Sequence, residues 1–277
     1  MDNPEFYIGW QPKAPASFAK QVKLTLLILF PVALITGYLL SSSQKKFSTS
    51  VFEYGKLTEV KGIYYNKPVP VLKVFDKNNL SITVPLFGYG KHGAETAIME
   101  MEKESGISLN GREVSMKGNL FYGNGKTWMQ IDKNDNPVLN IGNESSIKLL
   151  QKDLGTQTIR GEIIDPKCYF GAMKPGEGKV HRDCAIRCIL GGISPVLHVQ
   201  NEMGESNYYL IVGPNGEKMN EALKDVVAEP VRIEARVVQQ DDWIILYAGK
   251  ENIRRISYAQ MQNPGAKVIA CTNKCIE

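Results

Sequence analysis

One stretch near the N-terminus is almost entirely apolar. Between Leu24 and Gln44 no residue is charged. A helix of these 21 residues is about 30 Å long at 1.5 Å per residue, which matches the hydrocarbon core of a bilayer. The pattern therefore predicts a transmembrane helix over residues 24–44, preceded by an N-terminal tail of residues 1–23.

A cleaved signal peptide is the main alternative to a permanent membrane anchor. The tail is long for the first part of a signal peptide, and Ser41–Ser43 makes a weak cleavage site, so an uncleaved anchor is favoured. Basic residues do not set the orientation, because three lysines flank the helix closely on each side. Since a single N-terminal span usually exports the rest of its chain, we expect residues 45–277 on the periplasmic side of a bacterial cytoplasmic (inner) membrane.

After a polar linker, short strand-like runs of alternating apolar and polar residues follow, and their order occurs twice. Each copy has a glycine-containing strand, two further strands, one helical stretch and a closing hairpin that contains a tryptophan. In the first copy these are residues 57–63, 69–75, 81–86, 94–104 and 114–131. In the second copy they are residues 156–163, 196–199, 207–212, 217–227 and 231–246.

This order of strands, with a helix after the third, resembles the OB fold, a five-stranded barrel. The resemblance implies a mainly β protein in which one transmembrane helix is followed by two tandem OB-like β-barrels, each with one short helix. The barrels are expected over residues 50–142 and 155–258, with a C-terminal tail of residues 259–277. Two unrelated β-rich halves remain the alternative.

The second copy carries an insertion. Gly62 and Val114 are 52 residues apart, whereas the equivalent Gly161 and Val231 are 70 apart, an excess of 18. The excess lies in a cysteine-rich insertion at residues 165–192. Glycines and prolines predict a loop over its residues 168–180, and its residues 181–189 predict about two helical turns.

The insertion holds three of the five cysteines and one of the three histidines. On the predicted helix Cys184 and Cys188 share a face, with His181 one turn earlier. Two further cysteines near the C-terminus repeat the Cys-x3-Cys spacing. The candidate metal or disulfide residues are therefore Cys168, His181, Cys184, Cys188, Cys271 and Cys275.

Three interpretations of these cysteines stay open. Thiolates with an imidazole suit copper, zinc or an iron–sulfur cluster, and Cys-x3-Cys is locally similar to the copper-thiolate loops of respiratory copper proteins and their assembly factors. Alternatively, nearby cations activate a redox thiol pair. In the third interpretation, Cys168 forms a disulfide with Cys184 or Cys188 in an oxidising compartment.

Two further groups of residues are candidates for partner binding. Basic side chains of the insertion could attract an acidic redox partner. Aromatic side chains of the N-terminal tail could anchor the chain at the lipid bilayer or contact a neighbouring membrane protein. The basic group is Lys167, Lys174, Lys179, Arg182 and Arg187, and the aromatic group is Phe6, Tyr7 and Trp10.

Composition narrows the functional classes. The net charge of +4, from 33 basic and 29 acidic residues, is small for a nucleic-acid-binding protein, and a membrane anchor also argues against that partner. The layout is similar to that of the haem chaperone of bacterial cytochrome c maturation. However, no histidine is followed four residues later by tyrosine, so covalent haem is not expected. No nucleophile motif, paired-acid motif or dinucleotide fingerprint indicates an enzyme.

The sequence therefore predicts a non-enzymatic, membrane-anchored, extracytoplasmic accessory or assembly subunit of a larger membrane complex, with a respiratory electron-transfer complex favoured. The alternative is a thiol or metal protein. Such a protein would deliver copper or another metal, or exchange disulfides, through Cys184 and Cys188.

Overall fold

The structure is a computed structural model that describes residues 15–44, 49–78, 80–132, 137–171, 173–201 and 205–262. The chain separates into one unit that contains the N-terminal helix and a second unit that contains all the described strands. The aromatic tail residues Phe6, Tyr7 and Trp10 lie outside the described residues, as do Cys271 and Cys275.

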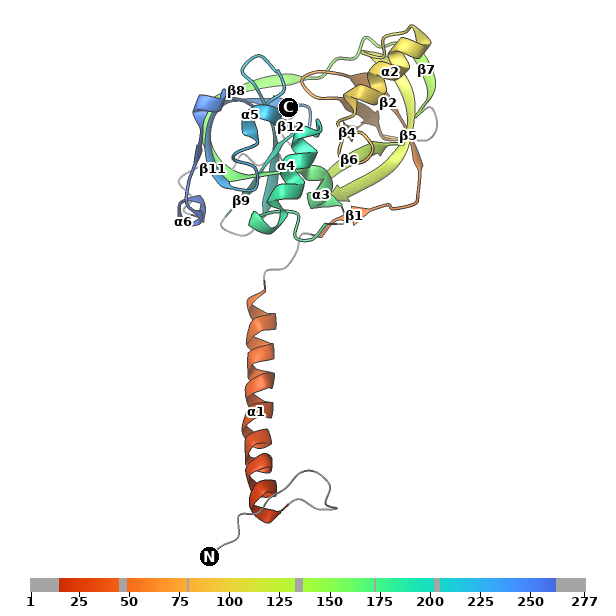
Figure 1. Cartoon of the computed structure of the whole chain (residues 1–277). Coiled ribbons are helices and arrows are strands. Elements are labelled where there is room, and N and C mark those ends of the chain that lie inside the picture. The colour runs from red at the N-terminus through yellow and green to blue at the C-terminus, as the bar shows by residue number, and fades with distance from the viewer. Residues whose placement is uncertain are drawn as a thin grey trace, which may run out of the picture. The chain divides into compact units, whose positions relative to one another are not determined.

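The N-terminal helix α1 spans Ala16–Ser43 (Figure 1). In the described part of the chain it is the one helix long and apolar enough to cross a membrane, a property that anchors share with signal sequences. It starts before the predicted Leu24 because the preceding residues include alanines and lysines, which favour helix. None of its residues is buried.

Five strands close into the first barrel in the order β2, β3, β4, β6, β5 and back to β2. The β4–β6 pair is parallel, whereas the other pairs around the barrel are antiparallel. The short strand β1 and the strand β7 both pair with β5. The elements are β1 (Val51–Phe52), β2 (Thr58–Tyr65), β3 (Val71–Phe75), β4 (Ser81–Phe87), α2 (Glu95–Ser105), β5 (Arg112–Gly123), β6 (Lys126–Ile131) and β7 (Val138–Glu144).

The second barrel repeats this connectivity in the order β8, β9, β10, β12, β11, again with one parallel pair, β10–β12. A third strand neighbour of β11 is the short β13. The elements are β8 (Gln151–Ile164), β9 (Val196–Gln200), β10 (Ser206–Val212), α5 (Asn220–Leu223), β11 (Pro230–Gln240), β12 (Trp243–Tyr247), η2 (Lys250–Asn252), β13 (Ile253–Arg255) and α6 (Tyr258–Gln262). Two closed five-stranded barrels with OB connectivity confirm the predicted fold class.

Equivalent glycines in the first strand of each barrel face the same steric constraint. A Cβ atom on Gly62 would lie 2.7 Å from the carbonyl oxygen of Lys73, and one on Gly161 would lie 2.4 Å from that of His198. In both barrels the second strand therefore passes too close to the first for any side chain. This shared constraint explains why the duplicated pattern keeps glycine at that position.

The two barrels also share an apolar core in addition to their own interiors. Trp128 of β6 and Trp243 of β12 occupy equivalent strands, and their rings meet edge to face with centroids 4.9 Å apart. Side chains of both barrels and of the insertion complete this layer. They include Val71, Phe87 and Phe121 of the first barrel, Tyr208, Leu210 and Ile245 of the second, and Tyr169, Phe170 and Cys188 of the insertion.

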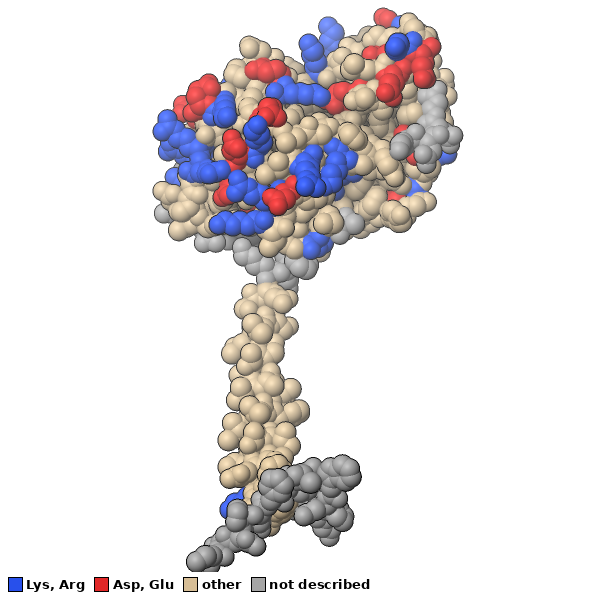
Figure 2. Space-filling model, viewed as in Figure 1, with Lys and Arg blue, Asp and Glu red and all other residues tan. Residues whose placement is uncertain are grey.

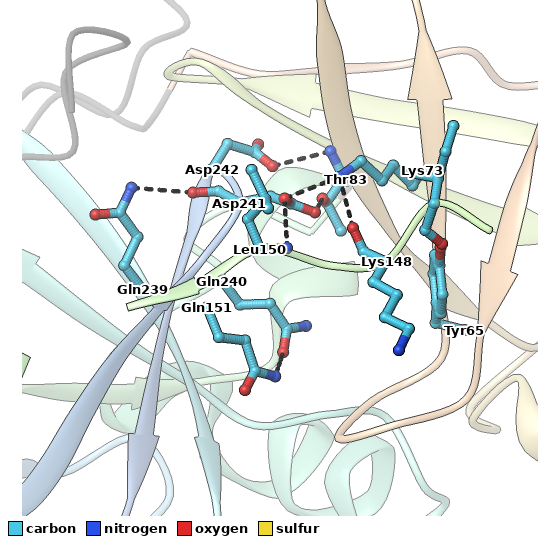
Figure 3. A network of polar contacts seen from close by, with 11 residues as sticks. Tyr65, Lys73, Thr83, Lys148, Leu150, Gln151, Gln239, Gln240, Asp241 and Asp242 are labelled. Carbon is cyan, nitrogen blue, oxygen red and sulfur yellow. Dashed lines mark hydrogen bonds and ion pairs between the residues drawn. The ribbon is translucent and has the colours of Figure 1, made fainter. Parts of the chain in front are cut away.

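A buried polar network joins the barrels beside this core (Figure 3). The ammonium group of Lys73 on β3 lies 2.9 Å from Asp241 Oδ1, and both side chains are 4% exposed. Asp241 lies in the turn between β11 and β12, and its carboxylate also accepts the Leu150 N–H. The next residue, Asp242, accepts the Thr83 N–H of β4 at 2.9 Å. The turn of one barrel is therefore held between strands of the other.

The second predicted helix is the main departure from the expected elements. The first, over residues 94–104, corresponds to α2, but the stretch 217–227 contains only the one-turn helix α5. Val227 leaves the helix to form a β-bridge with Ile163. β-Branched Val226 and Val227 also favour extended backbone, so tertiary pairing overrides the helical spacing.

Candidate functional site

The cysteine-rich insertion is folded into three short helices: α3 (Pro166–Phe170), η1 (Lys179–His181) and α4 (Arg182–Leu190). The predicted helical turns at 181–189 are therefore present, but the loop predicted over 168–180 is wrong at both ends, which belong to α3 and η1. Asp165 caps α3, because its carboxylate accepts the Lys167 N–H at 2.9 Å, and Pro166 takes the first helical position. Cys168 is consequently held on a helix.

The rest of the insertion is tied to the barrels. Lys174 donates to Ser50 Oγ and to the Tyr169 carbonyl, each at 2.7 Å. The Glu177 carboxylate lies 3.1 Å from Nδ1 of the buried His198 on β9. The insertion therefore packs on the shared core, where side chains of α3 contact both barrels.

Three thiols of the insertion meet at one place. Cys168 Sγ lies 3.9 Å from Cys184 Sγ and 4.0 Å from Cys188 Sγ, and all three sulfur atoms lie within 4.8 Å of one another. All three are free cysteines. A disulfide bond is about 2.05 Å long, so the Cys168 disulfide of the third interpretation is not present among these three cysteines. As predicted, Cys184 and Cys188 project from one side of a helix, here α4.

A second triad adjoins the first. A carboxylate oxygen of Asp165, Cys168 Sγ and a ring nitrogen of His181 also lie within 4.8 Å of one another. Asp165 is 0% exposed and His181 is 3% exposed. Within the described residues, Asp165 Oδ2 and His181 Nε2 have no hydrogen-bond partner. Burial lowers the pKa of His181, which favours the neutral imidazole that binds metals.

Two lysines bring positive charge to the thiols. Lys91 donates from the loop between β4 and α2 to Cys184 Sγ at 3.5 Å. The Lys167 ammonium group donates to the carbonyls of Gly88 and Gly90, and burial lowers its pKa to about 8. A hydrogen bond to Cys188, followed by burial and the charge of Asp165, raises the pKa of the Cys168 thiol. Without a bound cation, Cys168 is therefore protonated.

The sulfur spacing fits a single ion. Sulfur atoms bound to one tetrahedral zinc at about 2.3 Å are roughly 3.8 Å apart, close to the observed 3.9 and 4.0 Å. In a [4Fe–4S] cluster, by contrast, each of the four thiolates binds a different iron, which spreads the sulfur atoms further apart. The thiol triad is therefore arranged for one thiophilic ion.

The basic residues of the insertion divide into two groups. Lys167 and Lys174 are engaged as described above, and Arg182 pairs with Glu229 at 2.6 Å. Lys179 and Arg187 are exposed. Figure 2 shows Lys and Arg side chains gathered over the region of α3 and α4. Only part of the predicted basic group is thus available as a surface.

Sequence reasoning missed two members of the site. Asp165 had a usable signal, since an Asp-Pro pair is a favoured helix start and would have placed Cys168 on a helix. Lys91 had none, because 93 residues separate it from Cys184, and the loop that carries it reads only as a turn before a helix.

Comparisons with known proteins add little to this geometry. No family model and no curated protein matches the chain. Among solved structures, a deletion mutant of the single-stranded DNA binding protein from Thermus aquaticus is similar at a TM-score of 0.18 and 10% identity. That match covers 76% of this chain and 88% of the other. A likeness at this TM-score indicates neither fold nor function, so the function is inferred from the geometry of the site alone.

Proposed function

We propose that this chain is a membrane-anchored accessory protein that binds one soft metal ion, copper(I), through Cys168, Cys184 and Cys188. The observation that carries the proposal is the meeting of three free thiols at 3.9 and 4.0 Å. They come from two separate helices of an insertion whose other contacts hold it against the double barrel. Soft thiolate ligands select copper(I) and zinc among the common metals.

Copper(I) is preferred over zinc because of the number of sulfur ligands. Structural zinc sites are almost always four-coordinate, whereas the triad offers three sulfur atoms. Binding replaces the thiol protons and so leaves a net negative charge. Lys91 Nζ, 3.5 Å from Cys184 Sγ, lies where it stabilises that charge.

Disulfide exchange is less well supported than metal binding. The thiolate is the attacking species in exchange reactions, and the pKa of the Cys168 thiol is raised. Cys188 is 2% exposed, which keeps a partner's disulfide away from its sulfur. A small ion has no such steric limit.

The anchor and the surface beside the site support the accessory role. We assign α1 as an uncleaved membrane span with the barrels in the periplasm. Val180 is 82% exposed, and Lys179 and Arg187 of the same insertion are exposed basic residues. An acidic partner with an apolar centre fits this surface. A metal-bearing subunit of a respiratory complex fits these properties.

Metal analysis tests the site directly. The full chain, purified without oxygen in detergent and loaded with copper(I), is expected to keep about one copper at the thiol triad through desalting. Cys184→Ser and Cys188→Ser are each expected to weaken copper binding at least about 100-fold, because two thiolates replace three. Cys271→Ser is the matched control and should leave binding unchanged. Absence of copper from the reduced, folded wild-type protein would refute the proposal.

Gentle extraction tests the accessory role. On native electrophoresis the chain is expected to migrate in a complex with other membrane proteins. A charge-reversing Arg187→Glu variant should release it, whereas Lys103→Glu on the exposed side of α2 should not.

Alkaline phosphatase fused after the last residue should be active if the barrels are periplasmic. Migration as a lone monomer would contradict the complex, and an inactive fusion would contradict the orientation.

A further inference from the structure

The second triad, Asp165, Cys168 and His181, contains two buried polar atoms that the thiol triad does not explain. Asp165 Oδ2 and His181 Nε2 are buried, and neither has a hydrogen-bond partner in the described part of the chain. Buried polar atoms in native proteins are nearly always paired, so such atoms call for a ligand. Both belong to side chains whose ligand atoms lie within 4.8 Å of Cys168 Sγ.

His181 does not complete the coordination of a single ion at the thiol triad. A tetrahedral ion with sulfur and nitrogen ligands needs each ligand pair to be roughly 3.5–3.8 Å apart. The five ligand atoms instead fall into two triads that have only Cys168 Sγ in common. Asp165 and His181 therefore surround a position next to the thiol triad.

We propose that Asp165, Cys168 and His181 form a second cation position, which shares the Cys168 sulfur with the copper ion. This inference rests on the proposed function of the thiol triad. A carboxylate, an imidazole and a thiolate are the three ligand types that Zn²⁺ uses in proteins. The cation is therefore a divalent ion of the Zn²⁺ class, and Cys168 bridges the two ions.

Charge balance supports a second cation. Three thiolates and one carboxylate carry four negative charges, and one copper(I) ion cancels only one of them. A divalent ion at the second position cancels two more. Without that ion, the ammonium groups of Lys91 and Lys167 would cancel only two of the three charges that copper(I) leaves. Buried charges are stable only when they are compensated in this way.

To test this proposal, the full chain in detergent is loaded with one equivalent of copper(I) and then with excess zinc. The amounts of copper and zinc bound per chain are measured after desalting. The wild-type protein is expected to hold about one copper and about one zinc. Asp165→Asn and His181→Gln should each keep copper and lose zinc. The asparagine retains an oxygen that accepts the Lys167 N–H, so the start of α3 is preserved. His92→Ala, an exposed histidine in the neighbouring loop, is the control and should keep both metals.

The outcomes separate the two proposals. Copper without zinc in the wild-type protein, with weaker copper binding in His181→Gln, would make His181 a ligand of the copper ion and overturn the second position. Zinc retained by both Asp165→Asn and His181→Gln would place it elsewhere, with the same consequence. Failure of the reduced wild-type protein to bind copper would instead refute the thiol triad itself.

Discussion

Replacing Asp241 with asparagine is expected to lower the free energy of unfolding by about 3–5 kcal/mol, because it leaves a buried ammonium group without its counter-ion. The Lys73–Asp241 pair is 4% exposed on both sides and links the two barrels. Asparagine tolerates the positive φ of 49° at this position, so the loss reports the charge rather than backbone strain. Urea unfolding of the full chain, followed by fluorescence of the buried Trp128 and Trp243, measures it.

Two further variants show whether burial is the cause of that loss. Lys218→Ala removes an ion pair between the barrels in which Lys218 Nζ lies 2.7 Å from Glu95 Oε1 and the two side chains are 55% and 25% exposed. This loss should cost less than about 1 kcal/mol. A Lys73→Met, Asp241→Asn double variant removes both charges but keeps a residue that tolerates the positive φ and an oxygen for the Leu150 N–H, so it should regain much of the stability. A loss below about 1 kcal/mol for Asp241→Asn would show that water reaches the pair.

Replacing Phe170 with alanine is expected to cost about 3–5 kcal/mol, the usual penalty for deleting a fully buried aromatic ring. Phe170 is 0% exposed, and its ring lies 6.0 Å from Trp128 and 4.8 Å from Tyr208, measured between centroids. The resulting cavity lies at the junction of α3 with both barrels. We therefore also expect faster reaction of Cys188 with a maleimide.

Met173→Ala provides the control for this variant. Met173 lies three residues further along the insertion and is 48% exposed, so its truncation should change stability by no more than about 0.5 kcal/mol. If Phe170→Ala changes stability as little as Met173→Ala does, the packing of the insertion against the shared core does not stabilise the two barrels.

The sequence was sufficient for the five strands that close each barrel because they are short apolar runs bounded by polar residues and glycines. Buried and exposed positions alternate in β11, whereas β9, β10 and β12 are buried over nearly their whole length. Equivalent features, such as Gly62 with Gly161 and Trp128 with Trp243, also identified the duplication. The contact between the two tryptophan rings was not predictable, since it depends on how one barrel packs on the other. The stretch 217–227 shows the opposite failure, in which helical spacing was overridden by the bridge between Val227 and Ile163.

The site was predictable where its residues are close in sequence. The spacing of Cys184 and Cys188 placed both thiols on one face of a helix, as α4 has them. Their approach to Cys168 depends on α3, whose Asp-Pro start was overlooked. The basic residues illustrate the limit most clearly, because nothing local distinguishes Arg182, which pairs with Glu229, from the exposed Arg187.

X-ray absorption at the copper edge is the most direct test of a three-thiolate centre. The full chain loaded with one equivalent of copper(I) is expected to show about three sulfur neighbours at about 2.3 Å, the usual length of a metal–thiolate bond. Cys188→Ser should reduce the sulfur count by about one. A copper environment of nitrogen and oxygen alone, or one unchanged in Cys188→Ser, would contradict a metal site at Cys168, Cys184 and Cys188.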